Sequence, residues 1–371
     1  MKFIKENKNS NYDLVIEKII NDRKKEIFNF FDSDDIELNF NIYIYDSIKN
    51  LVKGLKQRGF KKDPDYMCAC HKDKDNSLNY FEPKDDPNEN EWSKDEYENV
   101  IFHELIHGIE YNLFGYAPEW VTEGIAKYLD GTYRKGIKYL MENYINKISI
   151  PDQKEIEEEF GFHDYDSYDY AYIMISYIIE VYGKKYLIEL LKDSNKLNIE
   201  KEGLLNRAVY YYNRKYFNLL DDYLNQDIDN PKYLFHGSPK RLRVIKPNLS
   251  HDSDNNKDNI ANAVFLFPSF TKSTPYAFKD IIKEDSKKQG MKYDFDIPNN
   301  DEYPLMTMSN VHINPDIVGY VYVFKKDKDM IKDMQTYQYK CFKELIPVDI
   351  VEVKYKDYER YYQIIDNIKR R

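Results

Sequence analysis

Cysteine is scarce in this sequence, and the few cysteines present do not suggest a disulfide framework. The 371 residues include only Cys68, Cys70 and Cys341. An odd number of cysteines is a poor basis for a set of stabilising bridges. We therefore expect reduced thiols.

Long apolar runs are also missing. The opening stretch, MKFIKENKNSNYDL, alternates charged and apolar residues, and the longest aliphatic stretches, such as YIMISYIIEV, are too short to cross a bilayer. We find neither a signal peptide nor a spanning helix in this pattern. The expectation is a soluble cytoplasmic protein that has no membrane partner.

Blocks of like charge are absent as well. The chain carries 65 acidic and 55 basic residues, a net charge of −10, and the two signs alternate along it. Nucleic acids attract proteins through basic patches, so we expect no nucleic acid partner. About 42% of the residues are apolar, which is enough for packed cores, and the length predicts two or three domains.

Residues 1–90 show the pattern of a small mixed sheet with helices. Apolar residues at helical spacing occupy residues 12–31, and the segment IELNFNIYIYDS then alternates with the period of a strand. A helix through IKNLVKGLKQRG and two strands, in DYMCACH and SLNYFEP, complete this part.

Residues 91–228 are predicted to be helical. Ser93 with Glu96 has the form of a capping box, and the helix it begins runs through HELIH to Gly115. A second helix, in EWVTEGIAKYLDG, ends at Gly131, and a third, in DYAYIMISYIIEVYG, is apolar almost all round and therefore buried.

A domain boundary is expected near residue 228. The polar segment NQDIDNPK precedes a region of short strand candidates, RLRVIKP, AVFLFPS, IVGYVYVFKK and PVDIVEVKY, separated by polar loops. The prediction is therefore an α+β protein. Residues 1–228 form a zincin-like region of a small mixed sheet and a helical bundle, and residues 232–371 form a smaller β-rich domain.

The motif HELIH carries the chemistry. Residues four apart on a helix differ by only about 40° in direction and about 6 Å along the axis, so His103 and His107 can bind one metal ion. Glu104 is turned about 100° from His103 and can face a bound water, as a general base would. Glu110 lies on the same face, but three ligands on one straight helix do not easily converge on a tetrahedral ion, so a third ligand is expected from elsewhere.

The pairing of HELIH with EWVTEGIA and a later tyrosine-rich helix resembles the gluzincin peptidases, especially the peptidase MA-like group, over roughly residues 35–195. The family segment Trp-x-x-Glu-Gly-x-Ala matches Trp120, Glu123, Gly124 and Ala126. The resemblance implies that Glu123 is the third ligand, with Glu119 as its rival. The small Gly124 and Ala126 are expected to let this helix approach the HELIH helix closely.

This resemblance implies a zinc metallopeptidase, a hydrolase with one Zn²⁺ per chain. Glu104 would activate the zinc-bound water for attack on a peptide or protein substrate. Gluzincins often add a tyrosine that stabilises the oxyanion. Tyr168, Tyr170 and Tyr172 compete for this role, and Tyr170 is our choice. The family also docks its substrate on an edge strand, for which SLNYFEP is the candidate.

One sequence feature bears on whether the enzyme cuts within a peptide or at its amino terminus. The free-amine-binding strand of aminopeptidases, Gly-x-Met-Glu-Asn, has no counterpart in SLNYFEP. This difference favours an endopeptidase over an aminopeptidase.

Two other groups of residues suggest different chemistry. The segment CACH offers Cys68, Cys70 and His71 as metal ligands, but its spacing is too tight for a zinc knuckle, and packing is the favoured interpretation. The second domain weakly resembles the ADP-ribosyltransferase-like fold, in which NAD would be a cofactor or substrate. The corresponding positions are His236, Tyr276 and Glu344.

A module that binds a protein partner is favoured for this domain over a transferase. A chain that keeps the zincin fold for recognition alone is the remaining alternative, and the intact Glu104 argues against it.

Overall fold

The computed structural model describes most of the chain as two compact units, Met1–Lys201 and Glu202–Arg371. Both units combine helices with small sheets, so the α+β class is confirmed. The helices between residues 204 and 225 fall in the second unit. The domain boundary near residue 228 stays a prediction. The described residues are 1–34, 37–60, 69–72, 75–82, 94–147, 149–151, 156, 167–249, 261–298, 303–333, 336 and 338–365.

The first unit contains a four-stranded mixed sheet with the order β1-β2-β4-β3. Strands β1, β2 and β4 are parallel, and β3 runs antiparallel to β4. The alternating apolar residues Ile42 and Ile44 of β2 are buried, as the period of two predicts. The strands are β1 (Lys2–Lys5), β2 (Asn41–Tyr45), β3 (Ala69–Lys72) and β4 (Ser77–Phe81).

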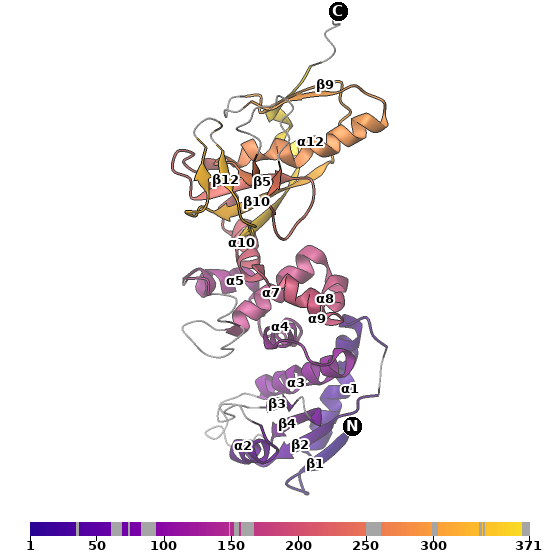
Figure 1. Cartoon of the computed structure of the whole chain (residues 1–371). Coiled ribbons are helices and arrows are strands. Elements are labelled where there is room, and N and C mark those ends of the chain that lie inside the picture. The colour runs from indigo at the N-terminus through magenta and orange to yellow at the C-terminus, as the bar shows by residue number, and fades with distance from the viewer. Residues whose placement is uncertain are drawn as a thin grey trace, which may run out of the picture. The chain divides into compact units, whose positions relative to one another are not determined.

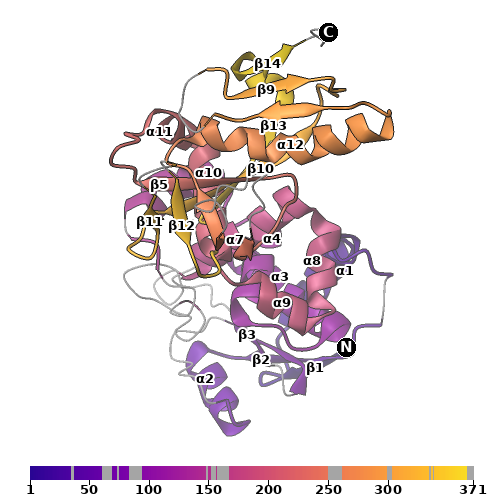
Figure 2. The ribbon, with the colours of Figure 1, turned by 45° about the horizontal axis from the view of Figure 1, so that its top comes forward.

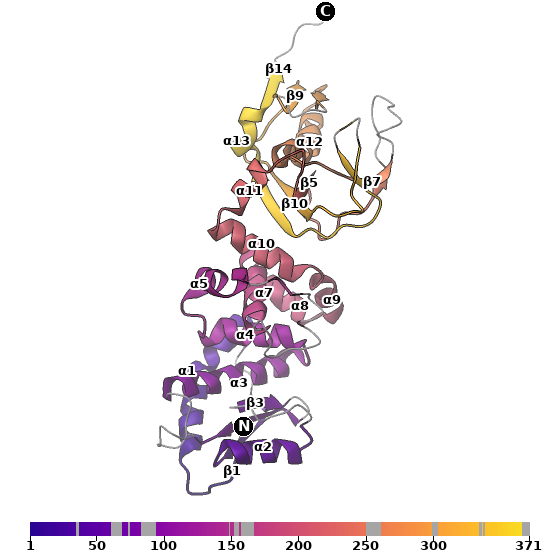
Figure 3. The same cartoon turned by 90° about the vertical axis from the view of Figure 1, so that its left-hand side faces the viewer.

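Helices cover both faces of this sheet. Helix α2 (Ile48–Gln57) buries Leu51 and Leu55 against Cys70 of β3. Helix α3 (Lys94–Phe114) lies on the opposite face, and Figures 1, 2 and 3 show the sheet between α2 and α3. Gly108 allows this contact, because a Cβ there would lie 3.2 Å from the Leu78 side chain of β4. Helix α1 (Tyr12–Phe30) packs against α3.

A second layer of helices follows α3. Helix α4 (Glu119–Asp130) packs closely on α7 (Ser167–Tyr182) at Gly124. A Cβ on Gly124 would lie 2.6 Å from the backbone oxygen of Ala171. The expectation that Gly124 serves the approach of α4 to α3 was therefore wrong, since it faces α7. The remaining helices of this unit are α5 (Gly136–Asn143), a 3₁₀ turn (Ile145–Lys147), α8 (Lys184–Leu191) and α9 (Ser194–Glu200).

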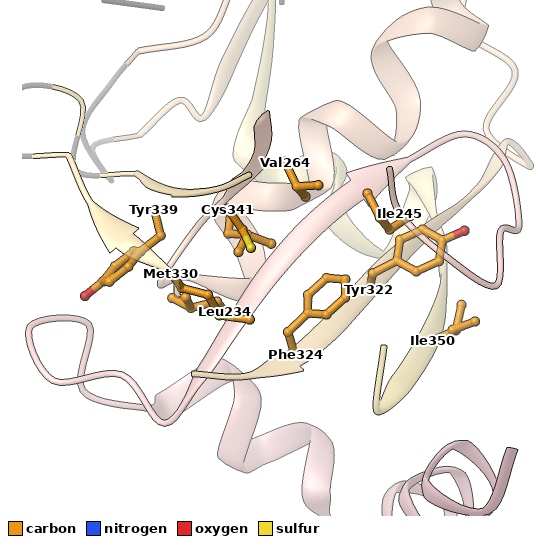
Figure 4. Close-up of a cluster of buried hydrophobic side chains, with 10 residues drawn as sticks. Leu234, Ile245, Val264, Tyr322, Phe324, Met330, Tyr339, Cys341 and Ile350 are labelled. Atoms are coloured by element: carbon orange, nitrogen blue, oxygen red, sulfur yellow. The ribbon is translucent and has the colours of Figure 1, made fainter. Parts of the chain in front are cut away.

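The second unit is built on short sheets around one long helix. Strand β10 (Val318–Lys325) pairs with both β5 (Tyr233–Ser238) and β13 (Asp349–Lys354). Helix α12 (Phe270–Lys288) packs on β5 and β10 where Gly237 and Gly319 leave room for its backbone. Figure 4 shows apolar side chains of these strands meeting those of a second small sheet. The cluster comprises Leu234, Ile245, Val264, Leu266, Tyr322, Phe324, Met330, Tyr339, Cys341 and Ile350.

The predicted strands of this unit are confirmed in part. AVFLFPS, IVGYVYVFKK and PVDIVEVKY contain β7, β10 and β13, but RLRVIKP forms only an isolated bridge from Ile245 to Leu345. Pro247 has no backbone N–H to extend that pairing. The other elements are α10 (Leu204–Tyr216), α11 (Leu219–Asn225), β6 (Asn248–Leu249), β7 (Asn262–Leu266), β8 (Asp294–Asp296), β9 (Met306–Ser309), β11 (Ile331–Lys332), β12 (Tyr339–Cys341), α13 (Tyr355–Tyr358), a 3₁₀ turn (Glu359–Tyr361) and β14 (Tyr362–Ile365).

Candidate metal centre

Helix α3 presents both histidines of HELIH to one point. It extends from Lys94 to Phe114, and Gly115 follows with a positive φ of 76°, so the predicted end of the helix is confirmed. The predicted capping residue Ser93 lies outside the described residues. The imidazole Nε2 atoms of His103 and His107 are 3.1 Å apart.

Glu123 of α4 completes the cluster. Its carboxylate oxygens lie 3.1 Å from Nε2 of His103 and 3.5 Å from Nε2 of His107. Among the described residues, this is the one group of three or more histidine, cysteine or acidic side chains whose donor atoms lie within 4.8 Å of one another. The predicted ligands His103, His107 and Glu123 are thus brought together, and the rival Glu119 is not part of the cluster.

The donor set fits zinc. Tetrahedral zinc sites have Zn–N distances of about 2.0–2.1 Å, which places neighbouring donor atoms about 3.3 Å apart. The observed separations of 3.1, 3.1 and 3.5 Å are close to this value. Two imidazoles and one carboxylate also form a typical catalytic set that leaves one position for solvent or substrate.

Asp130, which we did not predict from the sequence, orients the first histidine. Its Oδ2 accepts a hydrogen bond of 2.8 Å from Nδ1 of His103, while Oδ1 accepts one from the backbone N–H of Thr132. Because Nδ1 is held in this way, Nε2 is the nitrogen that faces the cluster. The available sequence signal was an acidic residue at the end of α4, directly before Gly131.

Burial and close contacts shift the pKa values of this cluster. Burial favours neutral His103, but its hydrogen bonds with Asp130 and Glu123 raise its pKa to about 10. The pKa of Glu123, which burial alone would raise, is held well below its usual range by His107 and His103. The pKa of His107 is raised, because Glu123 outweighs the effect of burial. The raised pKa values favour protonated histidines in the cluster, and a metal ion that binds there takes the place of these protons.

Glu104 is buried beside the cluster without joining it. It is 8% exposed and lines the same cavity as the three ligands. Its negative charge contributes to the raised pKa values of both His103 and His107. A carboxylate that lies near the donors and is not one of them has the position expected of a general base.

The cluster opens into a cavity of about 1200 Å³. Its walls are β3, one face of α3, one face of α4, the segment that follows α4, and Tyr168 and Asp169 of α7. All of these belong to the first unit. A cavity of this size can accept several residues of an extended peptide.

The structure does not bring Tyr170 to the cavity. Tyr170 is fully buried and is not among the residues that line the cavity, whereas Tyr168, two positions earlier on α7, does line it. Tyr172 stacks on Tyr133, with ring centroids 4.3 Å apart. The role of Tyr170 as oxyanion donor stays a prediction that this placement does not favour.

The edge strand beside the cavity is β3 and not the predicted SLNYFEP. That segment contains β4, which is paired on both sides, with β2 and with β3. In the described part of the chain β3 pairs only with β4, and its residues 69–72 line the cavity. The error arose because β2 and β4, which are distant in sequence, pair directly and leave β3 outside.

The CACH segment does not form a described metal site. Cys70 packs against Leu51 and Leu55, and burial raises the pKa of its thiol. Nε2 of His71 instead forms a hydrogen bond of 2.9 Å with the side-chain oxygen of Asn76. Cys68 lies outside the described residues.

The three residues suggested for an ADP-ribosyltransferase-like site have ordinary contacts in the second unit. Nδ1 of His236 donates to the backbone oxygen of Phe265 at 2.9 Å, and burial lowers its pKa. Tyr276 stacks on Phe267, and Glu344 forms an exposed ion pair with Lys246. These contacts give no support to the resemblance.

Comparison with known proteins agrees with the first unit's site. Residues 85–221 match the family model of the Peptidase MA superfamily. No curated protein matches the chain significantly. The match supports a zincin-like metallopeptidase over this part of the chain. No helix in the described residues is long and apolar enough to cross a membrane.

Proposed function

We propose that the chain is a zinc-dependent peptidase of gluzincin type that hydrolyses peptide bonds with Glu104 as its general base. The observation that carries this proposal is the convergence of His103, His107 and Glu123 beside Glu104 in one cavity. The match of residues 85–221 to the Peptidase MA superfamily supports it independently.

The residues of the chain divide the chemistry among them. Bound Zn²⁺ would supply a Lewis acid that polarises the substrate carbonyl and lowers the pKa of a water molecule toward about 7. Glu104 takes a proton from the attacking water and delivers it to the leaving amine. Asp130 holds His103 in the orientation that ligation needs.

One strand and one tyrosine are available to hold the substrate. Strand β3 offers an unpaired edge, within the described residues, along which an extended peptide can add as a further strand. Tyr168 lines the cavity and is the tyrosine of α7 that we propose in place of Tyr170 as oxyanion donor.

An ADP-ribosyltransferase activity is not favoured by any contact among the described residues of the second unit. A module that binds a protein partner stays our alternative for that unit, because a fold does not by itself fix a function. Release of nicotinamide from NAD by the full chain is the measurement that would reinstate a transferase.

The test combines metal content with turnover. Wild-type protein is expected to hold one zinc per chain by elemental analysis, and Glu123→Ala much less. Glu104→Gln is expected to keep its zinc and lose hydrolysis of a quenched fluorescent peptide library by at least about 10²-fold, because it removes the base and leaves the ligands. Glu98→Gln, on α3 outside the cavity, is the matched control. Hydrolysis that survives in Glu104→Gln would refute the mechanism.

A further inference from the structure

Glu110 is a buried acid that the proposed mechanism does not use. It belongs to α3 and is 1% exposed, and neither carboxylate oxygen has a hydrogen-bond partner among the described residues. A buried carboxylate without a partner is costly, so proteins normally pair it or leave it neutral. Burial accordingly raises the pKa of Glu110 to about 7. Such a group has unused capacity to bind a cation.

The position of Glu110 places it in the cavity beside the metal centre. It follows His107 by three residues, which puts it on the same face and about 4.5 Å further along the helix axis. Side chains on a helix lean toward its N-terminus, in this case toward His107. Glu110 lines the cavity but is not one of the converging metal donors. It is therefore placed to contact a bound molecule and not the metal ion itself.

Charge is distributed unevenly along the cavity. Glu119, Glu123 and Lys127 lie one turn apart on α4, and all three line the cavity. Glu119 begins α4 a few residues after α3 ends, so it lies toward the same end as Glu110. The opposite end holds Lys127 and, after α4, the cavity-lining Arg134 and Lys135, together with the acidic Asp130 and Asp169. That end therefore carries both signs of charge, whereas Glu110 and Glu119 add two carboxylates toward the C-terminal end of α3.

We infer that Glu110 binds a cationic group of the substrate, a primary ammonium or a guanidinium, at the acidic end of the cavity. It thereby selects peptides that carry a positive charge near the scissile bond. The group has two sources, the free amino terminus of a peptide or the side chain of a lysine or arginine. This inference rests on the proposed peptidase function and adds a substrate class to it.

The first experiment measures kcat/KM with zinc-loaded full-length protein. The probes are quenched hexapeptide pools with lysine placed at each position in turn, with free or acetylated amino termini. Matched pools replace lysine by norleucine, which keeps the length of the side chain and removes its charge. Wild type, Glu110→Gln and the control Glu98→Gln are compared, and the thermal unfolding of each is recorded.

The wild type and Glu98→Gln are expected to prefer a pool that carries the cationic group, a free amino terminus or a lysine, over the matched acetylated or norleucine pool by at least about tenfold, as loss of a buried charge partner predicts. Glu110→Gln should reduce this ratio to about one. A preference for free over acetylated pools identifies the amino terminus as the ligand, and a preference for lysine over norleucine pools identifies a side chain. A preference that is absent in the wild type, or unchanged in Glu110→Gln, overturns the inference.

A second measurement separates this inference from the proposed function. Binding of the same pools, labelled for fluorescence anisotropy, is measured with Glu104→Gln and with the double variant Glu104→Gln, Glu110→Gln. Tighter binding of cationic pools that depends on Glu110 upholds the cation site, even if the wild type hydrolyses no peptide. Absence of hydrolysis in the wild type would reject only the peptidase function. Hydrolysis together with charge-independent binding rejects the cation site and leaves the peptidase intact.

Discussion

At the scale of single residues, Asp130 shows what a local motif does not contain. The spacing within HELIH is enough to predict that His103 and His107 share one ion, because four residues make nearly one helical turn. The hydrogen bond from His103 to Asp130 joins positions 27 residues apart. It depends on how the end of α4 approaches α3, which no short pattern specifies.

Replacing Asp130 by asparagine is expected to weaken zinc binding by about 10–100-fold, the usual cost of losing the partner of a metal-bound histidine. The change keeps the shape of the side chain and removes the charge that holds Nδ1–H of His103. Competition with a fluorescent chelator gives the affinity. The same affinity in Asp130→Asn as in Glu98→Gln would show that Asp130 does not act through His103.

Zinc binding is expected to release protons near neutral pH. The pKa of His103 in the metal-free protein is raised to about 10, so its imidazole is protonated at pH 7.5, and zinc requires the unprotonated ring. Affinity should therefore increase as the pH rises toward 10, by up to about tenfold per pH unit for each proton released. Calorimetry in two buffers of different ionisation enthalpy counts the protons. Equal heats in both buffers would contradict this prediction.

At the scale of elements, the sequence predicts what lies along one segment better than what lies between segments. The C-terminal ends of α3 and α4 follow from Gly115 and Gly131, and the structure agrees. The identity of the edge strand depends on which strands pair, and alternation alone does not specify that order. The same limit explains Tyr170, because the pattern of α7 does not show which of its tyrosines faces the cavity, and Tyr168 lines it whereas Tyr170 does not.

The packing of α4 on α7 gives a test at this scale. Gly124→Ala places a Cβ 2.6 Å from the backbone oxygen of Ala171, so we expect a loss of about 1–3 kcal/mol in the free energy of unfolding. Gly108→Ala is the matched control, since its new Cβ approaches the Leu78 side chain at 3.2 Å and the Phe40 ring at 3.4 Å, which are side chains and not backbone. There the gain in helix propensity, up to about 1 kcal/mol, offsets the contact.

Urea unfolding of both glycine variants provides the measurement. If the contact of α4 with α7 fixes the position of Glu123, Gly124→Ala should also bind zinc more weakly than Gly108→Ala. Equal stability of the two variants would mean that α7 can shift without cost and does not fix the position of α4.

At the scale of the whole molecule, the ligands, Asp130 and the cavity all belong to the first unit. The second unit has its own apolar cluster, built from β5, β10 and β13 with a second small sheet (Figure 4). Two units with separate cores can unfold as separate transitions. A ligand that binds only one folded unit raises the stability of that unit by mass action.

Differential scanning calorimetry of the full chain is therefore expected to show two transitions, only one of which responds to zinc. With free zinc at about 100 times its dissociation constant, the responsive unit gains about 2.7 kcal/mol, which shifts its midpoint upward by several degrees. Glu123→Ala should remove this shift and leave the other transition where it was. If zinc instead raised both midpoints, the two units would not unfold independently, and the metal centre would stabilise the second unit as well as the first.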